Sequence, residues 1–584
     1  MVLGVVFSVP LWTAPLALVI PPFRRLVWYR MFAYSLGHSG AAFIKWGQWS
    51  SVRPDMFPQA LCDVLSSLHS GAPIHSWDFT RAQVEEAVDA KIAERFDSFD
   101  PVAIASGSIA QVYSAYIDGR HVAVKVRHPC VDEQIKMDFR IMRFVGEFLD
   151  SLPGLHWLNL ASSMEQFSHT IASQTRLDIE GHHLDLFNRN FRAQRASCGF
   201  PVAVLKTEAV LIESFEPGQL ATSLVVPFAK ARARRKLEAL EPAVAEGTAT
   251  ALEKSLLQQD LASGWGKWLW QKVAGCFGAG IEEDECGEEA DEALGYFVVC
   301  KGADVYLKML LHDNLMHADL HPGNILVQRG DAKKGVESRV VLVDAGMVAQ
   351  LQNDEQDNFI GFLHTLGAGD GRAAADFVLK FSKDQTCVSE EDIAAFQEAM
   401  RMLFLETCKG YGHNVDIGMV LRRVLQTLRL HKVRIDVNYA TLVLNLLCLE
   451  GLAGALQPDY SLLDGSKPLL EAYRIIPWPL NRVLFPCAYF FKRIHDKNHL
   501  ATMRRDRERE DRKRLQAISH AGAEGGISDA VHKVLVPAAF SAGASAVLLL
   551  LAGLMRKEEE SPGFPRARRT ESRQSRHGAW QRHR

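Results

Sequence analysis

One block of the sequence limits what this chain can fold into more than any other. The block reads HADLHPGN over residues 317–324, and a later apolar run leads into Asp344. It sets Asp319 and Asn324 five positions apart and adds a second carboxylate at Asp344. Carboxylate and amide oxygens bind Mg²⁺, and phosphoryl transfer depends on positioning and charge neutralisation. The spacing predicts a site for ATP phosphates in which Asp319 is catalytic and Asn324 and Asp344 hold the metal; the alternative is an Asx-rich turn between two strands.

The upstream sequence supplies the other parts of an ATP cleft in the order that protein kinases use. Val122–Lys125 indicates a buried strand ending in a lysine that would hold the α- and β-phosphates, so Lys125 joins Asp319 and Asn324 as a predicted catalytic residue. A small-residue loop precedes this strand at hairpin distance, and the residues expected to cover the nucleotide are Ala105, Ser106, Gly107, Ser108, Ile109 and Ala110. Kinase loops usually carry three glycines, whereas this loop keeps one and should be stiffer.

These motifs resemble those of the UbiB/aarF-domain family of atypical protein-kinase-like proteins. A second mark of that family is a KxGQ segment, extended here to the pattern KxGQxxSxRxDxxP, and the matching residues are Lys45, Gly47, Gln48, Ser51, Arg53, Asp55 and Pro58. The resemblance runs from about residue 35 to about residue 465, with an insertion. It includes the segments FIKWGQWSSVRPDMFP, SGSIAQVY and EGLAGALQPD, which are similar to the mitochondrial aarF-domain kinase 2 subfamily.

The resemblance implies specific roles for these residues. The KxGQ helix, with Lys45, Gly47 and Gln48, would pack over the cleft and disfavour phosphorylation of a peptide in trans. Glu180, at the end of one helix spanning 174–180, would pair with Lys125; the alternative is a solvated helix carboxylate. The backbone at Glu213 and Phe215 would contact adenine, unless this stretch is an ordinary exit from a strand.

The sequence departs from the family pattern at one place. The family often has acids at the positions of Gln174 and Arg176, and these would face Lys45. Arg176 cannot pair with Lys45, because like charges repel. Either Asp178 takes over from another face of the helix, or the KxGQ contact is weaker in this chain.

Together these features predict an α+β fold of the two-lobed protein-kinase type with a helical N-terminal extension and a helical C-lobe. The predicted parts are an apolar N-terminal segment at 1–30, the KxGQ extension at 31–100, the N-lobe at 101–218, the C-lobe at 219–475 with an insertion at about 229–292, an amphipathic charged region at 476–533, a transmembrane helix at 534–555 and a basic disordered tail at 556–584. Four prolines in the first 22 residues disfavour a straight helix there. That segment is either membrane-interfacial or the remnant of a longer N-terminus.

Composition limits the classes of partner and the cellular compartment that we expect for this chain. A net charge of −3 argues against dedicated nucleic-acid binding, and ten scattered cysteines without a C-x-x-C pair favour a reducing compartment. Residues 534–555 carry no charge and would span about 33 Å as a helix, enough to cross a hydrocarbon core of roughly 30 Å. A buried helix or helical hairpin is the alternative for that segment.

The resemblance implies a membrane-associated atypical kinase or ATPase that binds ATP (or ADP) with Mg²⁺ and supports lipid-quinone (coenzyme Q) biosynthesis or lipid homeostasis. Membrane lipid, a quinone precursor and quinone-biosynthesis proteins are the partners it implies. The expected location is a mitochondrial membrane, the inner one by preference, or a plastid membrane if the source is photosynthetic. The alternatives are a nucleotide-gated, non-catalytic scaffold and a conventional protein Ser/Thr kinase, which needs an open peptide groove.

Overall fold

The computed structural model describes most of residues 2–231 and 292–475 and scattered positions from 480 to 513. Within these ranges it leaves out 52, 70–73, 153–156, 158, 331–335, 414 and 459. The bulk of the predicted insertion, the predicted transmembrane helix at 534–555 and the basic tail lie outside the described residues. Every element below belongs to one compact unit, which comprises residues 1–241 and 252–508.

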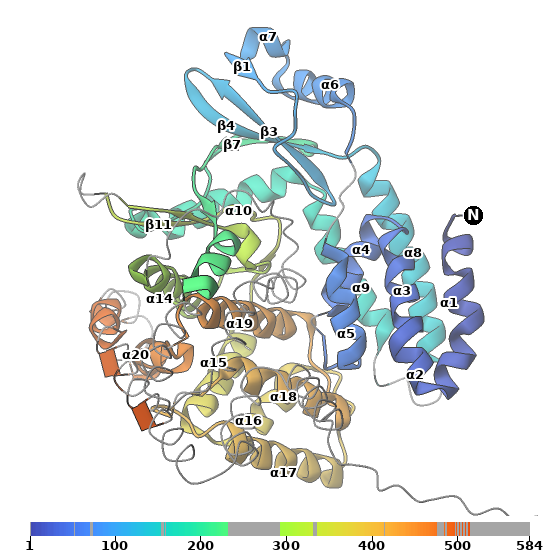
Figure 1. The fold of residues 1–584 in the computed structure, drawn as a ribbon, viewed down its shortest axis with the longest axis vertical. Coiled ribbons are helices and arrows are strands. Elements are labelled where there is room, and N and C mark those ends of the chain that lie inside the picture. The colour runs from blue at the N-terminus through green and yellow to red at the C-terminus, as the bar shows by residue number, and fades with distance from the viewer. Residues whose placement is uncertain are drawn as a thin grey trace, which may run out of the picture. The chain divides into compact units, whose positions relative to one another are not determined.

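A six-stranded antiparallel sheet forms the first part of the kinase-like body (Figure 1). Its strands are β1 (Ser98–Phe99), β2 (Ala105–Ser106), β3 (Ala110–Ile117), β4 (Arg120–Arg127), β6 (Ala203–Lys206) and β7 (Val210–Ser214). Strands β3 and β4 are joined by Asp118 and Gly119, which both have positive φ, as a two-residue hairpin turn requires. The register sets Val112 opposite Lys125, so the predicted lysine strand and covering loop are neighbours in one hairpin.

Helix α10 (Leu177–Asn190) lies against this sheet and contacts β6 and β7. Our prediction of a single helix across residues 174–180 is wrong. Helix α9 (Leu160–Gln174) ends at Gln174, and α10 starts anew after Arg176, whose backbone is extended (φ −103°, ψ 97°). Because of this break, Gln174 and Glu180 lie on two different helices.

The second part of the body is helical, as expected. A four-stranded sheet holds β5 (Cys198–Gly199), β11 (Arg339–Leu342), β10 (Ile325–Gln328) and β8 (Gln219–Leu220), and a two-stranded one pairs β9 (Met316–His317) with β12 (Val348–Ala349). Around them the helices are α14 (Glu292–Lys308), α15 (Asn353–Ala368), α16 (Gly371–Val378), α17 (Glu390–Thr407), α18 (Ile417–Leu430), α19 (Val437–Leu456) and α20 (Leu462–Ile475). One hydrophobic core runs through all of these helices.

Helix α19 is the one described helix that is long and apolar enough to cross a membrane by length and composition. More than half of it is buried inside the protein, and its Asn445 bonds to the loop after β9. These contacts are those of a core helix.

The N-terminal extension is a separate helical cluster with its own core. It comprises α1 (Val2–Val19), α2 (Pro21–Phe23), α3 (Tyr29–Gly37), α4 (Ala41–Ser51) and α5 (Gln59–Leu65), packed with α8 (Val131–Asp150) and α9. Pro10 and Pro15 lie inside α1, so these two prolines do not end the helix. Tertiary contacts override the local preference, because Trp28 Nε1 donates to Pro10 O at 2.9 Å and Phe7 packs against Phe32.

Candidate active site

Lys125 forms the centre of a buried ion cluster. Its Nζ lies 2.6 Å from Glu180 Oε1 on α10 and 3.1 Å from Glu213 Oε1 on β7. The same ammonium donates to the carbonyl oxygen of Val343 at 3.1 Å, directly before Asp344. The predicted pair of Lys125 with Glu180 therefore exists in the structure, and the solvated-carboxylate alternative for Glu180 is excluded.

Burial and mutual repulsion set the charges of this cluster. Burial raises the pKa of Glu213 to about 7, although Lys125 acts in the opposite direction. Burial also raises the pKa of Glu180, again against Lys125. For Lys125 burial favours the neutral amine, but Glu180, Glu213 and Asp344 outweigh it and raise the pKa of Lys125 above its ordinary value. The lysine stays charged.

Asp344 ends the strand-like run after β11 and remains ionised. Burial opposes its charge, yet Lys125, the Gly346 N–H and Lys45 together hold the pKa of Asp344 below its usual range. The Gly346 N–H donates to Asp344 Oδ1 at 2.9 Å. Lys45 of the KxGQ segment therefore acts electrostatically on Asp344, whereas we expected it to face acids on the helix that carries Glu180.

The loop after β9 holds the other predicted phosphate-site residues. Asn324 is buried and its Nδ2 donates to Asp319 O at 3.0 Å. The Val343 N–H donates to Asn324 O at 3.0 Å, so Asn324 and Asp344 lie at the same end of the β10–β11 hairpin. Because the amide nitrogen of Asn324 is engaged, its Oδ1 is the atom left for a cation.

A buried asparagine on α19 fixes this loop from behind. Asn445 Nδ2 donates to His317 O at 2.7 Å, and Asn445 Oδ1 accepts from the Leu320 N–H at 3.2 Å. The two bonds clamp the backbone on either side of Asp319. Sequence reasoning missed Asn445, and its signal is a lone amide within a highly apolar helix.

The covering loop, residues 105–110, comprises β2, a tight turn at 107–109 and the first residue of β3, and the Gly107 N–H donates to Ala110 O at 2.9 Å. His128 Nε2 lies 3.0 Å from Gly107 O, so the loop is also held from the end of the lysine strand. This second contact was not predicted. The loop stands beside the strand that carries Lys125, as expected.

The backbone of Glu213 and Phe215, which we predicted to contact adenine, takes part in strand pairing, and the adenine contact itself stays a prediction. Glu213 is paired with Ala123 on β4 and with Ala203 on β6, and its side chain goes to Lys125. The Phe215 N–H donates to His121 O at 3.1 Å, so it continues the strand pairing. Sequence reasoning missed the side-chain role of Glu213, although a single carboxylate inside an apolar strand was a visible signal.

The KxGQ residues pack tightly within the N-terminal extension. A Cβ at Gly47 would lie 2.3 Å from Leu68 Cδ1, so only glycine fits there without a shift of that leucine. Gln48 Nε2 donates to Leu68 O at 3.2 Å. Arg176 is half-exposed and pairs with Asp178 and Glu208. The Asp178 carboxylate, which was the alternative partner for Lys45, is therefore engaged by Arg176.

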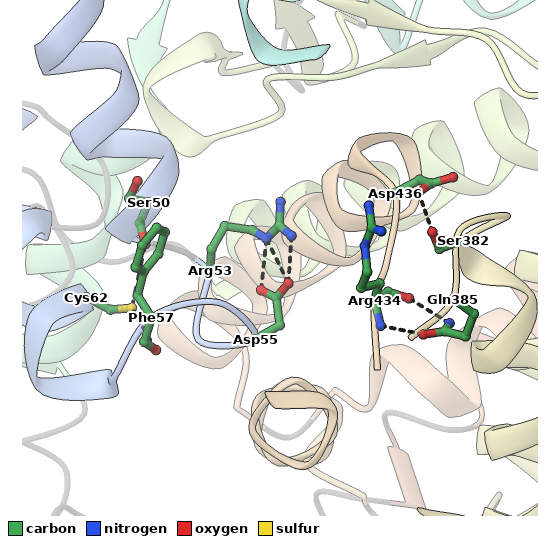
Figure 2. Close-up of polar contacts among 9 residues, drawn as sticks. All are labelled: Ser50, Arg53, Asp55, Phe57, Cys62, Ser382, Gln385, Arg434 and Asp436. Atoms are coloured by element: carbon green, nitrogen blue, oxygen red, sulfur yellow. Dashed lines mark hydrogen bonds and ion pairs between the residues drawn. The ribbon is translucent and has the colours of Figure 1, made fainter. Parts of the chain in front are cut away.

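Arg53 and Asp55 of the same motif form a bidentate ion pair that is almost completely buried. Arg53 Nη2 lies 2.6 Å from Asp55 Oδ2 and Nε lies 2.8 Å from Oδ1, as Figure 2 shows. The Arg53 guanidinium also stacks over Trp49 at 4.6 Å. The pair lines a small cavity together with Arg434 and Asp436, which precede α19. The Arg53–Asp55 pair fixes the turn between α4 and α5, which follows Lys45.

The donor set suits a magnesium nucleotide. A largely buried ammonium, an amide oxygen and an ionised carboxylate converge on one end of the β10–β11 hairpin, and the surrounding carboxylates are in excess over Lys125. Excess negative charge in a buried site favours a divalent cation. Asn324 and Asp344 are the residues that could hold it, and Lys125 could meet phosphate oxygens.

The fold and this site define a protein-kinase-like domain, and comparison with known proteins identifies its family. A model described as the ABC1 atypical kinase-like domain matches residues 67–219 and 280–377. The chain belongs to this UbiB/ABC1 family.

Relatives match over most of the chain. A probable serine/threonine-protein kinase abkC of Dictyostelium discoideum is 28% identical over 533 residues, which covers 80% of this chain and 68% of the relative. A mitochondrial ABC1 family protein of Saccharomyces cerevisiae is 26% identical, with coverage of 77% and 68%. A probable protein kinase UbiB of Shewanella piezotolerans is 24% identical, with coverage of 74% and 67%. A Mycobacterium tuberculosis protein solved with erythromycin aligns with 66% of this chain and 84% of its own, at 15% identity and a TM-score of 0.36.

Proposed function

We propose that this protein is a membrane-associated atypical kinase or ATPase that binds Mg-ATP and supports lipid-quinone biosynthesis or lipid homeostasis. The observation that carries the proposal is the ion pair of Lys125 with Glu180, 2.6 Å long, beside the ionised Asp344. An ammonium fixed by a helix carboxylate next to a metal-binding carboxylate is the arrangement that phosphoryl transfer needs.

Each residue then has a definite task. Lys125 binds α- and β-phosphate oxygens, and the covering loop closes over them. Asn324 Oδ1 and Asp344 hold Mg²⁺, which neutralises charge on the transferred phosphoryl group. Asp319 orients the attacking hydroxyl or water, and Asn445 keeps the Asp319 backbone in position through its bonds to His317 and Leu320.

The lipid and quinone part of the proposal is supported by the names of relatives rather than by geometry. Bacterial relatives carry the name UbiB, and fungal relatives are called mitochondrial. We therefore propose a mitochondrial membrane as the location, with membrane lipid, a quinone precursor and quinone-biosynthesis proteins as partners. The predicted segment at 534–555 would provide the anchor.

One observation favours the second candidate, a nucleotide-gated scaffold without turnover. Lys125 is already shared between Glu180, Glu213 and the carbonyl oxygen of Val343. Phosphate oxygens must compete with the Glu213 carboxylate for this ammonium. Such competition permits nucleotide binding while slowing the chemical step.

Phosphate release by the full-length protein in nanodiscs decides between the candidates. Release from Mg-ATP should be measurable, should rise with anionic lipid and a quinone-like headgroup, and should fall by 10²-fold or more in Asp319→Asn. Tight nucleotide binding with no release under any lipid condition would establish the scaffold instead. Efficient labelling of an added generic peptide would favour a conventional protein kinase.

A further inference from the structure

A line of polar side chains, of which three are buried and His75 is partly exposed, runs beside the covering loop and ends on it. Tyr113 Oη lies 2.7 Å from Thr80 Oγ1, which lies 2.8 Å from His75 Nε2. His75 Nδ1 lies 2.7 Å from His128 Nδ1, and His128 Nε2 lies 3.0 Å from Gly107 O. Apart from the contact of His128 with Gly107, these four side chains have no task in the site described above.

The partners fix the direction of every hydrogen bond in this line. A carbonyl oxygen only accepts, so His128 Nε2 carries a proton and, in the neutral ring, His128 Nδ1 accepts. His75 Nδ1 must then donate, which leaves His75 Nε2 to accept from the Thr80 hydroxyl. Thr80 in turn accepts from Tyr113. With both histidines neutral, all donors therefore point from Tyr113 towards Gly107.

His128, at the end of the line, fixes the orientation of the peptide plane between Gly107 and Ser108 in the covering loop. In a planar trans peptide the C=O and the following N–H point in opposite directions. Because His128 holds the Gly107 carbonyl on its own side, the Ser108 N–H is turned away from His128. Within the described part of the chain this N–H has no hydrogen-bond partner. A free backbone N–H is the group with which such loops meet phosphate oxygens.

His128 also binds the loop a second time and follows the lysine strand directly. The His128 N–H donates to Ile109 O at 2.9 Å, and the His75 N–H donates to Gln111 Oε1 at 3.0 Å. His128 comes three residues after Lys125 on the same stretch of chain. The short segment from Lys125 to His128 thus sets the distance between the lysine and the covering loop.

We propose that His128, oriented by His75, is a positioning residue for nucleotide binding: it holds the Gly107 carbonyl so that the Ser108 N–H faces the phosphates. The inference rests on the proposed binding of Mg-ATP and assigns part of its affinity to a side chain outside the phosphate site.

An added proton reverses the bond between His75 and Thr80. If either ring becomes an imidazolium, His75 Nε2 donates to Thr80 Oγ1 and no longer accepts the Thr80 proton. One of the two buried hydroxyl protons, that of Thr80 or that of Tyr113, then lacks an acceptor, which is costly. A second proton would set two N–H groups against each other between His75 and His128.

The surroundings keep the rings neutral near neutral pH. Burial, and secondarily His128, lowers the pKa of His75 to about 4, and burial lowers the pKa of His128. The described groups that contact the two rings from α6 (Trp77–Val88), from β3 and from the covering loop carry no charge. On β4 the nearest cation, Arg127, turns its guanidinium to Thr175 O.

Two substitutions at His128 separate positioning from packing. The test measures the affinity of full-length protein in nanodiscs for Mg²⁺ with a non-hydrolysable ATP analogue, together with thermal stability. His128→Leu should weaken binding roughly tenfold, because the Gly107 carbonyl loses its donor. His128→Gln keeps an amide N–H that reaches Gly107 and should bind within about twofold of the original. Both variants lose the bond to His75, so their melting temperatures should fall together.

Histidine NMR provides an independent spectroscopic readout. At neutral pH the ¹⁵N spectrum of the full-length protein should show both rings neutral, with the proton of His75 on Nδ1 and that of His128 on Nε2. Unchanged affinity in His128→Leu, equal loss in His128→Gln, or an imidazolium or the opposite tautomer at either ring overturns the inference alone. A wild-type protein that binds no nucleotide overturns the proposed function together with the inference.

Discussion

Glu213 Oε1 lies 3.1 Å from Lys125 Nζ, and the same ammonium pairs with Glu180 at 2.6 Å. One lysine thus joins two carboxylates that are both buried. The strand pairing of Glu213 with Ala123 brings this contact within reach, because Glu213 and Lys125 project from the same face of neighbouring strands. The arrangement makes both the stability and the nucleotide affinity of the protein sensitive to the protonation of Glu213.

Glu213→Gln should change the pH dependence of stability. The folded-state pKa of Glu213 is raised from 4.5 to about 7, so the folded state binds more protons than the unfolded state between these values. The free energy of unfolding of the wild type therefore falls as pH rises through that window, by about 3 kcal/mol at most from this residue. Urea unfolding at pH 5 and pH 8 should show the variant gaining stability relative to the wild type at pH 8. Parallel pH curves would contradict this assignment.

Asn445→Leu should reduce turnover more than nucleotide affinity. It leaves His317 O and the Leu320 N–H without their partner, at a cost of about 1–3 kcal/mol, and loosens the backbone around Asp319. Asn188→Leu is the matched control, since Asn188 donates to two carbonyl oxygens, Leu184 O and Pro201 O, away from the site. Steady-state kinetics should show a selective fall in kcat for Asn445→Leu. Equal effects of the two substitutions on kcat would refute the positioning role.

Gly47→Ala should destabilise the N-terminal extension by roughly 1–3 kcal/mol, because the new Cβ would lie 2.3 Å from Leu68 Cδ1. Adding Leu68→Ala should recover part of that loss. A Cβ at Gly454 on α19 meets nothing within 4 Å, so Gly454→Ala serves as the control and should be neutral or stabilising. Chemical denaturation of the wild type, both single variants, the double variant and the control measures the effect. Additive losses in the double variant would mean that Leu68 is not the obstacle.

Asp55→Asn should cost about 3–5 kcal/mol, because it leaves the buried Arg53 guanidinium without its counter-charge. Arg53→Met combined with Asp55→Leu should cost less than Asp55→Asn alone, since no unpaired charge stays buried. A double-mutant cycle monitored by thermal unfolding gives the coupling between the two residues. Zero coupling would show that the pair does not fix the turn after α4.

Local features of this fold could be predicted from the sequence. The lysine strand, the covering loop and the strand ending at Ser214 follow from short apolar runs and turn residues, and the structure has all three. The long C-lobe helices also follow from their apolar spacing, as α15, α17 and α19 confirm. Each of these signals is contained within about 20 residues.

Contacts between distant segments could not be predicted in this way. The direction of the Glu213 side chain depends on the register of β7 against β4, and the clamp by Asn445 joins positions 128 residues apart. The break between α9 and α10 at Arg176 depends on tertiary contacts as well, such as the bond from the Leu177 N–H to Glu208 O. A sequence pattern specifies which residue types are present but not which of their faces meet.

The most direct test of the account is the Mg²⁺ dependence of ATP binding in the wild type and in Asp344→Asn, measured by calorimetry on full-length protein in nanodiscs. Asp344 is ionised beside Lys125, so the wild type should bind ATP at least tenfold more tightly with Mg²⁺ than with EDTA. Asp344→Asn should lose most of this difference while it remains folded. Equal Mg²⁺ dependence in both proteins, or no ATP binding by the wild type, would contradict the central claim.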